Sequence, residues 1–279
     1  MEQPFVYCLN TSTIRGSALP ISRVVEIAAS AGFTALEPWI DELDRHVAEG
    51  GSLRDLGRKI CDLGLSVESA VGFFEWIVDD EERREAGYQE ARRNMQMLAE
   101  LGGKRLAAPA FGAQEAAPIP LQGAAQRYGT LLEMGRHYGV TPMVEVWGFS
   151  TNLRLLGEAM YVALESGRPG ACVLPDTYHL YKGGSGYEGI KLLNASAIGI
   201  FHVNDYPASP GRDRVTDADR VYPGDGVAPL TQVFRDLRSI GYHSALSVEL
   251  FNEEYWRSDP AEVAATALRK TRDAVAGSL

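Results

Sequence analysis

Eight short apolar runs, each separated from the next by a longer segment of helical period, constrain the fold of this chain more than any other feature. We expect strands at Phe5 to Leu9, Ala35 to Trp39, Ser66 to Val71, Arg105 to Ala108, Pro142 to Trp147, Ala171 to Pro175, Ile198 to Val203 and Ala245 to Leu250. Strands that alternate with helices in this way are typical of βα units and a parallel sheet.

The segments between the runs carry helix start and stop signals. Ser52-x-x-Asp55 and Asp259-x-x-Glu262 resemble capping boxes, which begin helices. A glycine follows each of six helical segments and precedes a strand, at the place where a helix commonly ends with a residue of positive φ. These glycines are Gly32, Gly64, Gly102, Gly139, Gly167 and Gly241.

The eight units fill the 279 residues without a Pro/Ser-rich linker. Closed α/β barrels commonly use about 250 residues as one domain. The sequence therefore predicts an α/β fold, a single (β/α)₈ TIM barrel over residues 1–279. The connection from Asp205 to Gly226 is longer and more polar than the others and holds three prolines and three glycines. Long loops in compact domains are usually functional or disordered.

Charge and hydropathy exclude two classes of partner. The chain has 27 Lys and Arg against 37 Asp and Glu, a formal net charge of −10, and a pI near 5.1. Nucleic-acid-binding proteins usually show a basic surface or stripe, so we expect no nucleic-acid partner. No apolar run approaches the roughly 18 residues of a membrane span, so we expect no membrane partner.

The three cysteines point to a reducing compartment. Cys8, Cys61 and Cys172 lie far apart, form no CxxC pair and leave an odd number. This usage argues against a disulfide framework or a thiolate zinc site. The residues at the start of the chain lack the basic and apolar regions of a signal peptide. We therefore expect a cytoplasmic location.

Ionisable residues end or interrupt four consecutive apolar runs. Glu145, Asp176, His202 and Glu249 come from the fifth to the eighth run. Active residues of (β/α)₈ barrels gather at the carboxyl ends of the strands, and unpaired charges there are costly. Three carboxylates and an imidazole in one pocket call for a cation between them. This oxygen and nitrogen ligand set suits Mn²⁺, Mg²⁺, Co²⁺ or Zn²⁺.

Five segments of the chain also resemble a known family. The segments are Val144 to Gly148, Asp176 to His179, His202 to Asp205, Asp219 to Gly226 and Ser247 to Phe251. They are similar to the sugar phosphate isomerase/epimerase family, also called xylose isomerase-like TIM barrels. The last third of the chain looks closest to the 2-keto-myo-inositol isomerases. The resemblance runs from about Phe5 to Ala274 in pattern, and its motifs are specific from Glu145 onward.

The resemblance implies a site and a reaction. One divalent metal ion would be held by Glu145, Asp176, His202 and Glu249, and would chelate oxygens of a keto sugar or polyol. Glu145 and Glu249 would be the catalytic residues, exchanging protons with a substrate carbon from opposite faces through a cis-enediolate. His179 and Arg220 match substrate-binding positions.

Two further residues are substrate-binding candidates on their own sequence context. Glu37 lies in the second apolar run and is expected to orient a substrate hydroxyl or to form a structural ion pair. Trp147 follows Glu145 by two residues and, like Trp39, is a candidate wall for a sugar ring. Other aromatic residues have the same two interpretations, ring wall or core packing.

Departures from the family pattern narrow the activity. Ketose 3-epimerases of the family place another Glu a few residues beyond the strand-5 ligand, where this chain has Phe149 to Asn152. This difference disfavours a standard ketohexose epimerase. The related endonucleases need additional histidines, whereas this chain has five in all and offers Glu37 and Glu68 after its second and third runs. A trinuclear zinc nuclease is therefore disfavoured.

Several alternatives stay open. An isomerase or epimerase is the leading hypothesis, and a lyase acting on an inosose or a 3-keto-glycoside would use the same first step. A non-catalytic sugar-binding barrel is the third, although intact Glu145 and Glu249 argue against it. The loop from Asp205 to Gly226 and the segment from Gly183 to Gly186 are candidates for closing over a site or packing on a second copy in a homo-oligomer.

Overall fold

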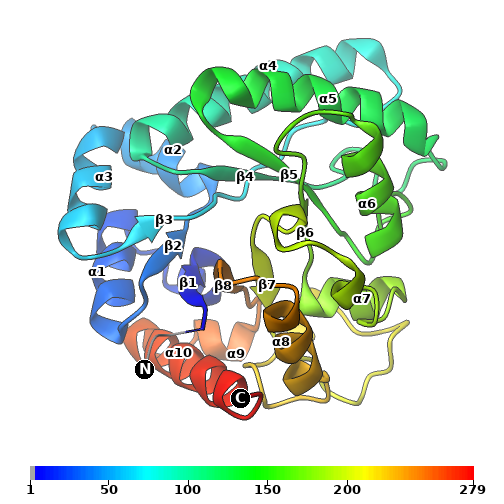
Figure 1. Ribbon diagram of the computed structural model, residues 1–279. Coiled ribbons are helices and arrows are strands. Elements are labelled where there is room, and N and C mark those ends of the chain that lie inside the picture. Colours follow the sequence, from blue (N-terminus) through cyan, green and yellow to red (C-terminus); the bar gives the residue numbers. More distant parts are fainter. Residues whose placement is uncertain (1–3) are drawn as a thin grey trace.

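Eight parallel strands, one within each expected run, form the centre of the computed structural model, which describes residues 4–279 (Figure 1). They are β1 (Val6–Asn10), β2 (Ala35–Glu37), β3 (Ser66–Val67), β4 (Arg105–Ala108), β5 (Thr141–Glu145), β6 (Val173–Leu174), β7 (Phe201–Val203) and β8 (Ala245–Val248). Six of the strands are shorter than the apolar runs, chiefly β3 and β6, whereas β1 and β4 have the expected length. The expected α/β barrel is confirmed.

Two sheets, joined by three isolated bridges, close the barrel. One sheet has the strand order β3-β2-β1-β8-β7 and the other has the order β4-β5-β6. The bridge between Ala70 and Leu106 joins β3 to β4. Bridges from Val173 to Ile198 and from Asp176 to His202 join β6 to β7. The runs at β3 and β6 therefore stay extended beyond the ladder and complete the ring by single bridges.

The helices form the outer ring around the strands (Figure 1). They are α1 (Ile21–Ala31), α2 (Ile40–Ala48), α3 (Leu53–Asp62), α4 (Glu81–Leu101), α5 (Leu121–Tyr138), α6 (Leu156–Glu165), α7 (Thr177–Gly183), α8 (Leu230–Ser239), α9 (Glu253–Trp256) and α10 (Pro260–Ala276). Four short 3₁₀ helices are η1 (Thr11–Ser17), η2 (Ile190–Leu192), η3 (Ala195–Ala197) and η4 (Asp217–Asp219). Helix α10 packs on α1, so the last helix closes the ring.

The expected helix signals are used as caps. The Ser52 hydroxyl accepts the N–H of Asp55 (3.3 Å), and the Asp259 carboxylate accepts the N–H groups of Ala261 (2.8 Å) and Glu262 (3.2 Å). All six predicted stop glycines have positive φ, between 60° and 93°. A residue with a Cβ is strained in that conformation, which explains the glycines there.

Alternation along the strands gives the barrel interior an apolar lower layer. Inward-facing residues contribute a small buried cluster, separate from the larger core under the helices. Its members are Cys8, Ala35, Ala107, Met143, Cys172, Leu174, Ile200 and Ala245. Side chains two residues further along a strand face the same way. The next inward positions are therefore Asn10, Glu37, Glu145, Asp176, His202 and, after Ser247, Glu249.

The long connection after β7 is ordered by polar anchors. The Asp205 carboxylate accepts the N–H groups of Tyr206 (2.8 Å), Gly224 (3.0 Å) and Ala228 (2.8 Å). Lys182 Nζ, from α7, donates to three carbonyl groups of the loop at 2.9 to 3.1 Å. This loop delivers η4 and Arg220 to the carboxyl end of the barrel. No helix within residues 4–279 has the length and apolar character needed to cross a bilayer.

Candidate metal centre and active site

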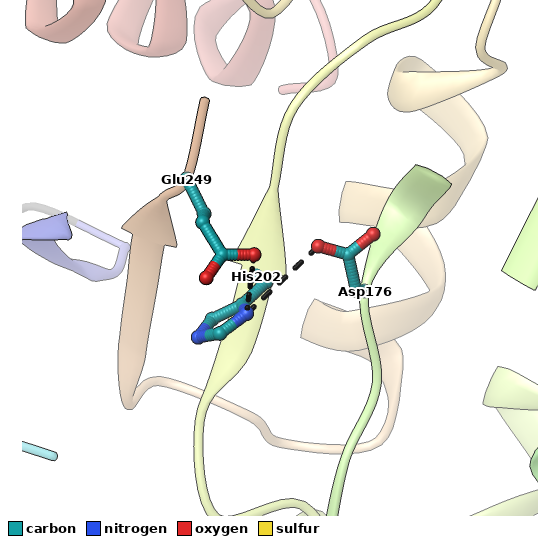
Figure 2. Close-up of side chains that lie close together, drawn as sticks. All are labelled: Asp176, His202 and Glu249. Carbon is teal, nitrogen blue, oxygen red and sulfur yellow. Dashed lines mark ion pairs between the residues drawn. The ribbon is translucent and has the colours of Figure 1, made fainter. Parts of the chain in front are cut away.

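The side chains of Asp176, His202 and Glu249, three of the four residues expected from the sequence, point toward one another (Figure 2). His202 Nδ1 lies 3.2 Å from Glu249 Oε2 and 3.8 Å from Asp176 Oδ2. One ligand atom from each of the three residues lies within 4.8 Å of the others, and all three side chains are buried. They come from the ends of β6, β7 and β8, so neighbouring parallel strands bring them together.

Glu145, at the end of β5, borders the same cavity but lies outside this close group. Its side chain is 4% exposed, and its Oε2 has no hydrogen-bond partner among the described residues. Burial raises the pKa of this carboxyl well above its ordinary value. The nearby His202 lowers this pKa, whereas the carboxylates of Glu249 and Asp176 raise it further. An orphaned buried carboxylate oxygen is the expected mark of a cation-binding group.

The donor set therefore fits a divalent metal ion. Carboxylate oxygens and one imidazole nitrogen are ligands that Mg²⁺, Mn²⁺, Co²⁺ and Zn²⁺ accept. His202 Nδ1, like Glu145 Oε2, is buried and forms no hydrogen bond with the described residues. Nδ1 faces the carboxylates of Asp176 and Glu249, so it could bind the same metal ion as they do.

Glu37 fixes the orientation of the His202 ring. Its Oε2 lies 2.9 Å from His202 Nε2, and it also accepts the Ser247 hydroxyl (2.6 Å) and Asn10 Nδ2 (3.0 Å). Asn10 Nδ2 is 3.1 Å from Glu249 Oε1 as well. Glu37 is fully buried and is not among the residues that line the cavity. The structure thus places Glu37 behind His202 and outside the cavity lining, in an ion pair of the kind that was one of its two expected roles.

Arg220 reaches the same centre from the long loop. Its Nη1 donates to Glu249 Oε2 (2.8 Å) and to Asp176 Oδ2 (3.1 Å), and its Nη2 is bonded to Asp217. Its guanidinium stands over the ring of Tyr178 at 4.5 Å. Although burial alone would lower the pKa of Arg220, the surrounding carboxylates raise it. The side chain is fully buried and remains charged.

His179 lies beside Arg220 on the first turn of α7. Asp176 caps this helix by accepting the His179 N–H (2.8 Å), and His179 Nε2 lies 3.1 Å from Arg220 Nη2. The Gly148 N–H donates to His179 Nδ1 (3.2 Å). Burial lowers the pKa of His179 to about 3, so the ring is neutral at pH 7. A Cβ on Gly148 would lie 2.3 Å from the His179 carbonyl oxygen, so glycine is required there.

An aromatic collar surrounds the cavity above these groups. The collar comprises Trp39, Phe73, Trp147, Phe149, Phe251 and Trp256, and the cavity of about 340 Å³ also borders Glu145, Glu249, His179 and Arg220. Ring centroids are 5.4 Å apart for Trp39 and Phe73 and 4.8 Å for Trp147 and Phe149. Trp39 and Trp147 therefore line the cavity, as their positions after strand-end carboxylates predicted.

The structure also separates residues that the sequence grouped together. Glu68 does not join the centre, because it turns toward the amino end of β4 and forms ion pairs with Lys104 and with Arg105 (3.0 Å). Asn10 and Ser247 were missed, although both occupy inward positions on strands. Their alternation with buried apolar residues was the available signal.

Comparisons with known proteins agree with this arrangement. A model of the xylose isomerase-like TIM barrel family matches residues 25–274. The chain belongs to this family. The family expected from the five sequence segments is thereby confirmed.

The curated relatives that match include inosose isomerases. That of Halalkalibacterium halodurans is 32% identical over 146 residues, which are 52% of this chain and 51% of that protein. The inosose isomerase of Bacillus subtilis (strain 168) is 30% identical over 146 residues, 52% of either chain. The chain thus spans about half the length of the curated relatives it matches.

Solved structures share the barrel over nearly its full length. The IolI protein, with a bound zinc atom, superposes with a TM-score of 0.91 at 23% identity and covers 99% of both chains. An L-ribulose 3-epimerase gives a TM-score of 0.77 at 18% identity over 98% of this chain and 95% of its own. At these identities the likeness establishes the fold.

Proposed function

We propose that the chain is a divalent-metal-dependent isomerase or epimerase of a neutral keto-polyol of the inosose type. The observation that carries the proposal is the pair Glu145 and Glu249, two buried carboxylates that border one cavity beside a metal-type cluster. The names of the inosose isomerases among the relatives support the same substrate class.

The metal ion would be held by Glu145, Asp176, His202 and Glu249. When bound, it would polarise a substrate carbonyl and stabilise the negative charge that develops on its oxygen. The ligand types admit Mn²⁺, Mg²⁺, Co²⁺ and Zn²⁺, and the zinc in the IolI structure favours testing zinc first.

The two glutamates would move the proton. One carboxylate removes the hydrogen on the carbon next to the carbonyl, and the other returns a proton to that carbon or its neighbour. Both side chains are almost completely buried in the cavity wall, and each carboxyl group exchanges its proton with solvent between turnovers, so solvent deuterium enters the substrate. Transfer from opposite faces gives an epimer, and transfer within one face gives a ketone isomer.

The lining of the cavity favours a substrate without phosphate. Among the described residues that line it, Arg220 is the one cation, and its guanidinium is already bonded to Asp176, Glu249 and Asp217. Asp217 and Glu253 add negative charge at the rim. A phosphate dianion would meet net repulsion there, whereas the C–H face of a polyol ring packs well on aromatic side chains.

The remaining residues would position the substrate. We propose that neutral His179 and the Arg220 Nε–H, which has no partner among the described residues, hydrogen-bond substrate oxygens and that Trp147 packs on the ring. Glu37 would act through His202 by holding its Nε2–H and leaving Nδ1 for the metal, as outer carboxylates do in metal sites generally. We also propose a cytoplasmic location, because Cys8, Cys61 and Cys172 form no disulfide.

A deuterium experiment tests the proposal. Metal-stripped protein would be reconstituted with each of the four ions and given a panel of inososes and keto-sugars in ²H₂O. We expect deuterium in the recovered ketone without loss of water or of a leaving group, and none after stripping the metal. Loss of water or of an aglycone would instead identify the lyase alternative, which shares the first step.

The Glu145→Gln variant supplies the control for this experiment. Glutamine keeps the size of the side chain but cannot accept the proton, so exchange should fall at least a hundredfold. Glu165→Gln, at an exposed position of α6, should leave it unchanged. Exchange that persists in Glu145→Gln, or that is absent with every ketone and metal, would overturn the proposed function.

A further inference from the structure

A groove of about 300 Å³ lies between α2 and α4, beside the active-site cavity. We infer that this groove is a second carbohydrate-binding subsite, which takes a hydroxyl-bearing ring attached to the reacting keto-polyol. The inference rests on the proposed function for the reacting end of that substrate. It extends the substrate class from a free ring to a glycoside of that ring.

The groove adjoins the cavity across a shared wall. Trp39, Val71 and Phe73 border both spaces. Trp39 and Phe73 are members of the aromatic collar, so a ligand whose ketone lies near Glu145 and Glu249 reaches the groove by passing over the edge of these two rings. All three residues follow β2 and β3, on the face where barrel enzymes bind their substrates.

Asn94 gives the groove a polar side chain that can donate to a ligand. Its side chain is 1% exposed and lines the groove from α4. Its Oδ1 receives Arg93 Nη1 at 3.4 Å, whereas its Nδ2 donates to no atom of residues 4–279. Because Asn94 lines the groove, its Nδ2 can donate to a ligand hydroxyl there.

Gly72 keeps this amide accessible. A Cβ at position 72 would lie 2.9 Å from Ile40 Cγ1 and 3.0 Å from Asn94 Nδ2. Any other residue would therefore crowd the amide nitrogen and the wall of the groove. The backbone of Gly72 has no positive φ, so close approach is what requires glycine at this position.

The charges at the groove are paired with one another. Arg15 binds Asp41 at 2.7 Å and stands 4.5 Å over the Trp39 ring. Arg93 pairs with Glu90 at 3.0 Å and with Asp44. The groove thus presents hydrogen-bonding oxygens and an amide with no free cation, beside an aromatic ring. Such a surface matches a neutral polyhydroxylated ring better than an anion or an apolar group.

Asn94→Leu tests the subsite on the metal-loaded protein. The probes are the monocyclic ketone that exchanges deuterium fastest and the same ketone carrying a glucosyl group. We expect Asn94→Leu to raise the KM for the glucosylated ketone about tenfold, as for one lost hydrogen bond, and to leave kcat and KM for the free ring within twofold. Asn94→Asp, which keeps the shape but loses the donor, should act in the same direction.

Gln96→Leu is the matched control, because it makes a similar change at an exposed position of the same helix. It should change kcat and KM for neither ketone. If Asn94→Leu and Asn94→Asp affect both ketones equally, or neither, the subsite is wrong.

A binding measurement separates failure of the subsite from failure of the proposed reaction. Saturation-transfer NMR with methyl maltoside distinguishes its two rings. We expect contact with both rings in the unaltered protein and loss of contact with one ring in Asn94→Leu. Absence of any second-ring contact, or its persistence in the variant, would overturn the subsite even if no ketone exchanged deuterium.

Discussion

Alternation along single strands decides which side chains reach the centre of this barrel. Met143 and Glu145 face inward from β5, and Ile200 and His202 do so from β7, with the polar residue nearer the carboxyl end. The apolar layer closes the lower barrel and the polar layer opens to the cavity. Residues that reach the centre also need partners behind them, which is the role we assign to Glu37.

Glu37→Gln should weaken metal binding tenfold to a hundredfold. The amide keeps the volume of the side chain but holds the His202 Nε2–H less strongly and no longer raises the basicity of the ring. A competition titration with a chromophoric chelator measures the affinity. Glu68→Gln, at a buried carboxylate remote from the centre, is the control and should leave the affinity unchanged. Equal affinities in Glu37→Gln and the unaltered protein would show that the contact with His202 is structural only.

The sequence was sufficient to find the inward carboxylates and the histidine but not their pairing. Each of Glu145, Asp176, His202 and Glu249 interrupts an apolar strand, which is visible in one run of residues. The contact between Glu37 and His202 joins residues 165 positions apart, and no local pattern encodes it. For that reason the sequence leaves Glu37 open between a substrate contact and a structural ion pair, and it does not single out Asn10 and Ser247.

At the scale of elements, a single lysine holds the loop that carries Arg220. Lys182→Met removes the ammonium that donates to the carbonyl groups of Arg212, Asp213 and Val215 but keeps an apolar stem of similar length. Hydrogen bonds from charged groups contribute about 1.5–3 kcal/mol. We expect trypsin to cleave after Arg212 and Arg214 roughly tenfold faster, as followed by mass spectrometry. Lys191→Met, at an exposed position of η2, should leave the cleavage rate unchanged.

Two glycines of the same loop differ in what surrounds them. A Cβ at Gly226 would lie 2.2 Å from the Tyr206 carbonyl oxygen, whereas nothing lies within 4 Å of one at Gly211. Gly226→Ala should therefore lower the free energy of unfolding by about 1–3 kcal/mol and raise the KM of the substrate, because Arg220 lies in the displaced segment. Gly211→Ala should change neither. Urea unfolding and steady-state kinetics of both variants make the comparison.

Element boundaries were less predictable than element identity. The runs at Ser66 to Val71 and Ala171 to Pro175 were expected to be full strands, yet β3 and β6 each contain two residues. Strand assignment needs hydrogen bonds on a neighbouring strand, and the ends of these runs form single bridges such as that of Ala70 with Leu106. The apolar pattern of a run reflects the burial of its side chains, and this burial continues past the residues that are hydrogen-bonded as a strand.

For the whole molecule, the two ends of the barrel use charge differently. The carboxyl end gathers acids around the proposed metal centre, whereas the amino end pairs Glu68 with Lys104 and Arg105. Burial alone would raise the pKa of Glu68, but hydrogen bonds from Lys104 and Ser66 and the two nearby cations lower it below its ordinary value. Glu68 thus links the stability of the barrel to pH without involving the catalytic face.

The sign of this linkage follows from the direction of the shift. Because the pKa of Glu68 is lower in the folded than in the unfolded state, its contribution to stability is complete above the unfolded value of about 4.3 and is lost as the pH falls through the folded value. Glu68→Gln should therefore be less stable than the unaltered protein at pH 7, and the difference should shrink as the pH falls below about 4.3. Urea unfolding midpoints at pH 7, 5 and 3.5 measure the difference. A difference that stays constant over this range would show that Glu68 contributes through packing and neutral hydrogen bonds, and that its ion pairs add nothing to the closure of the barrel.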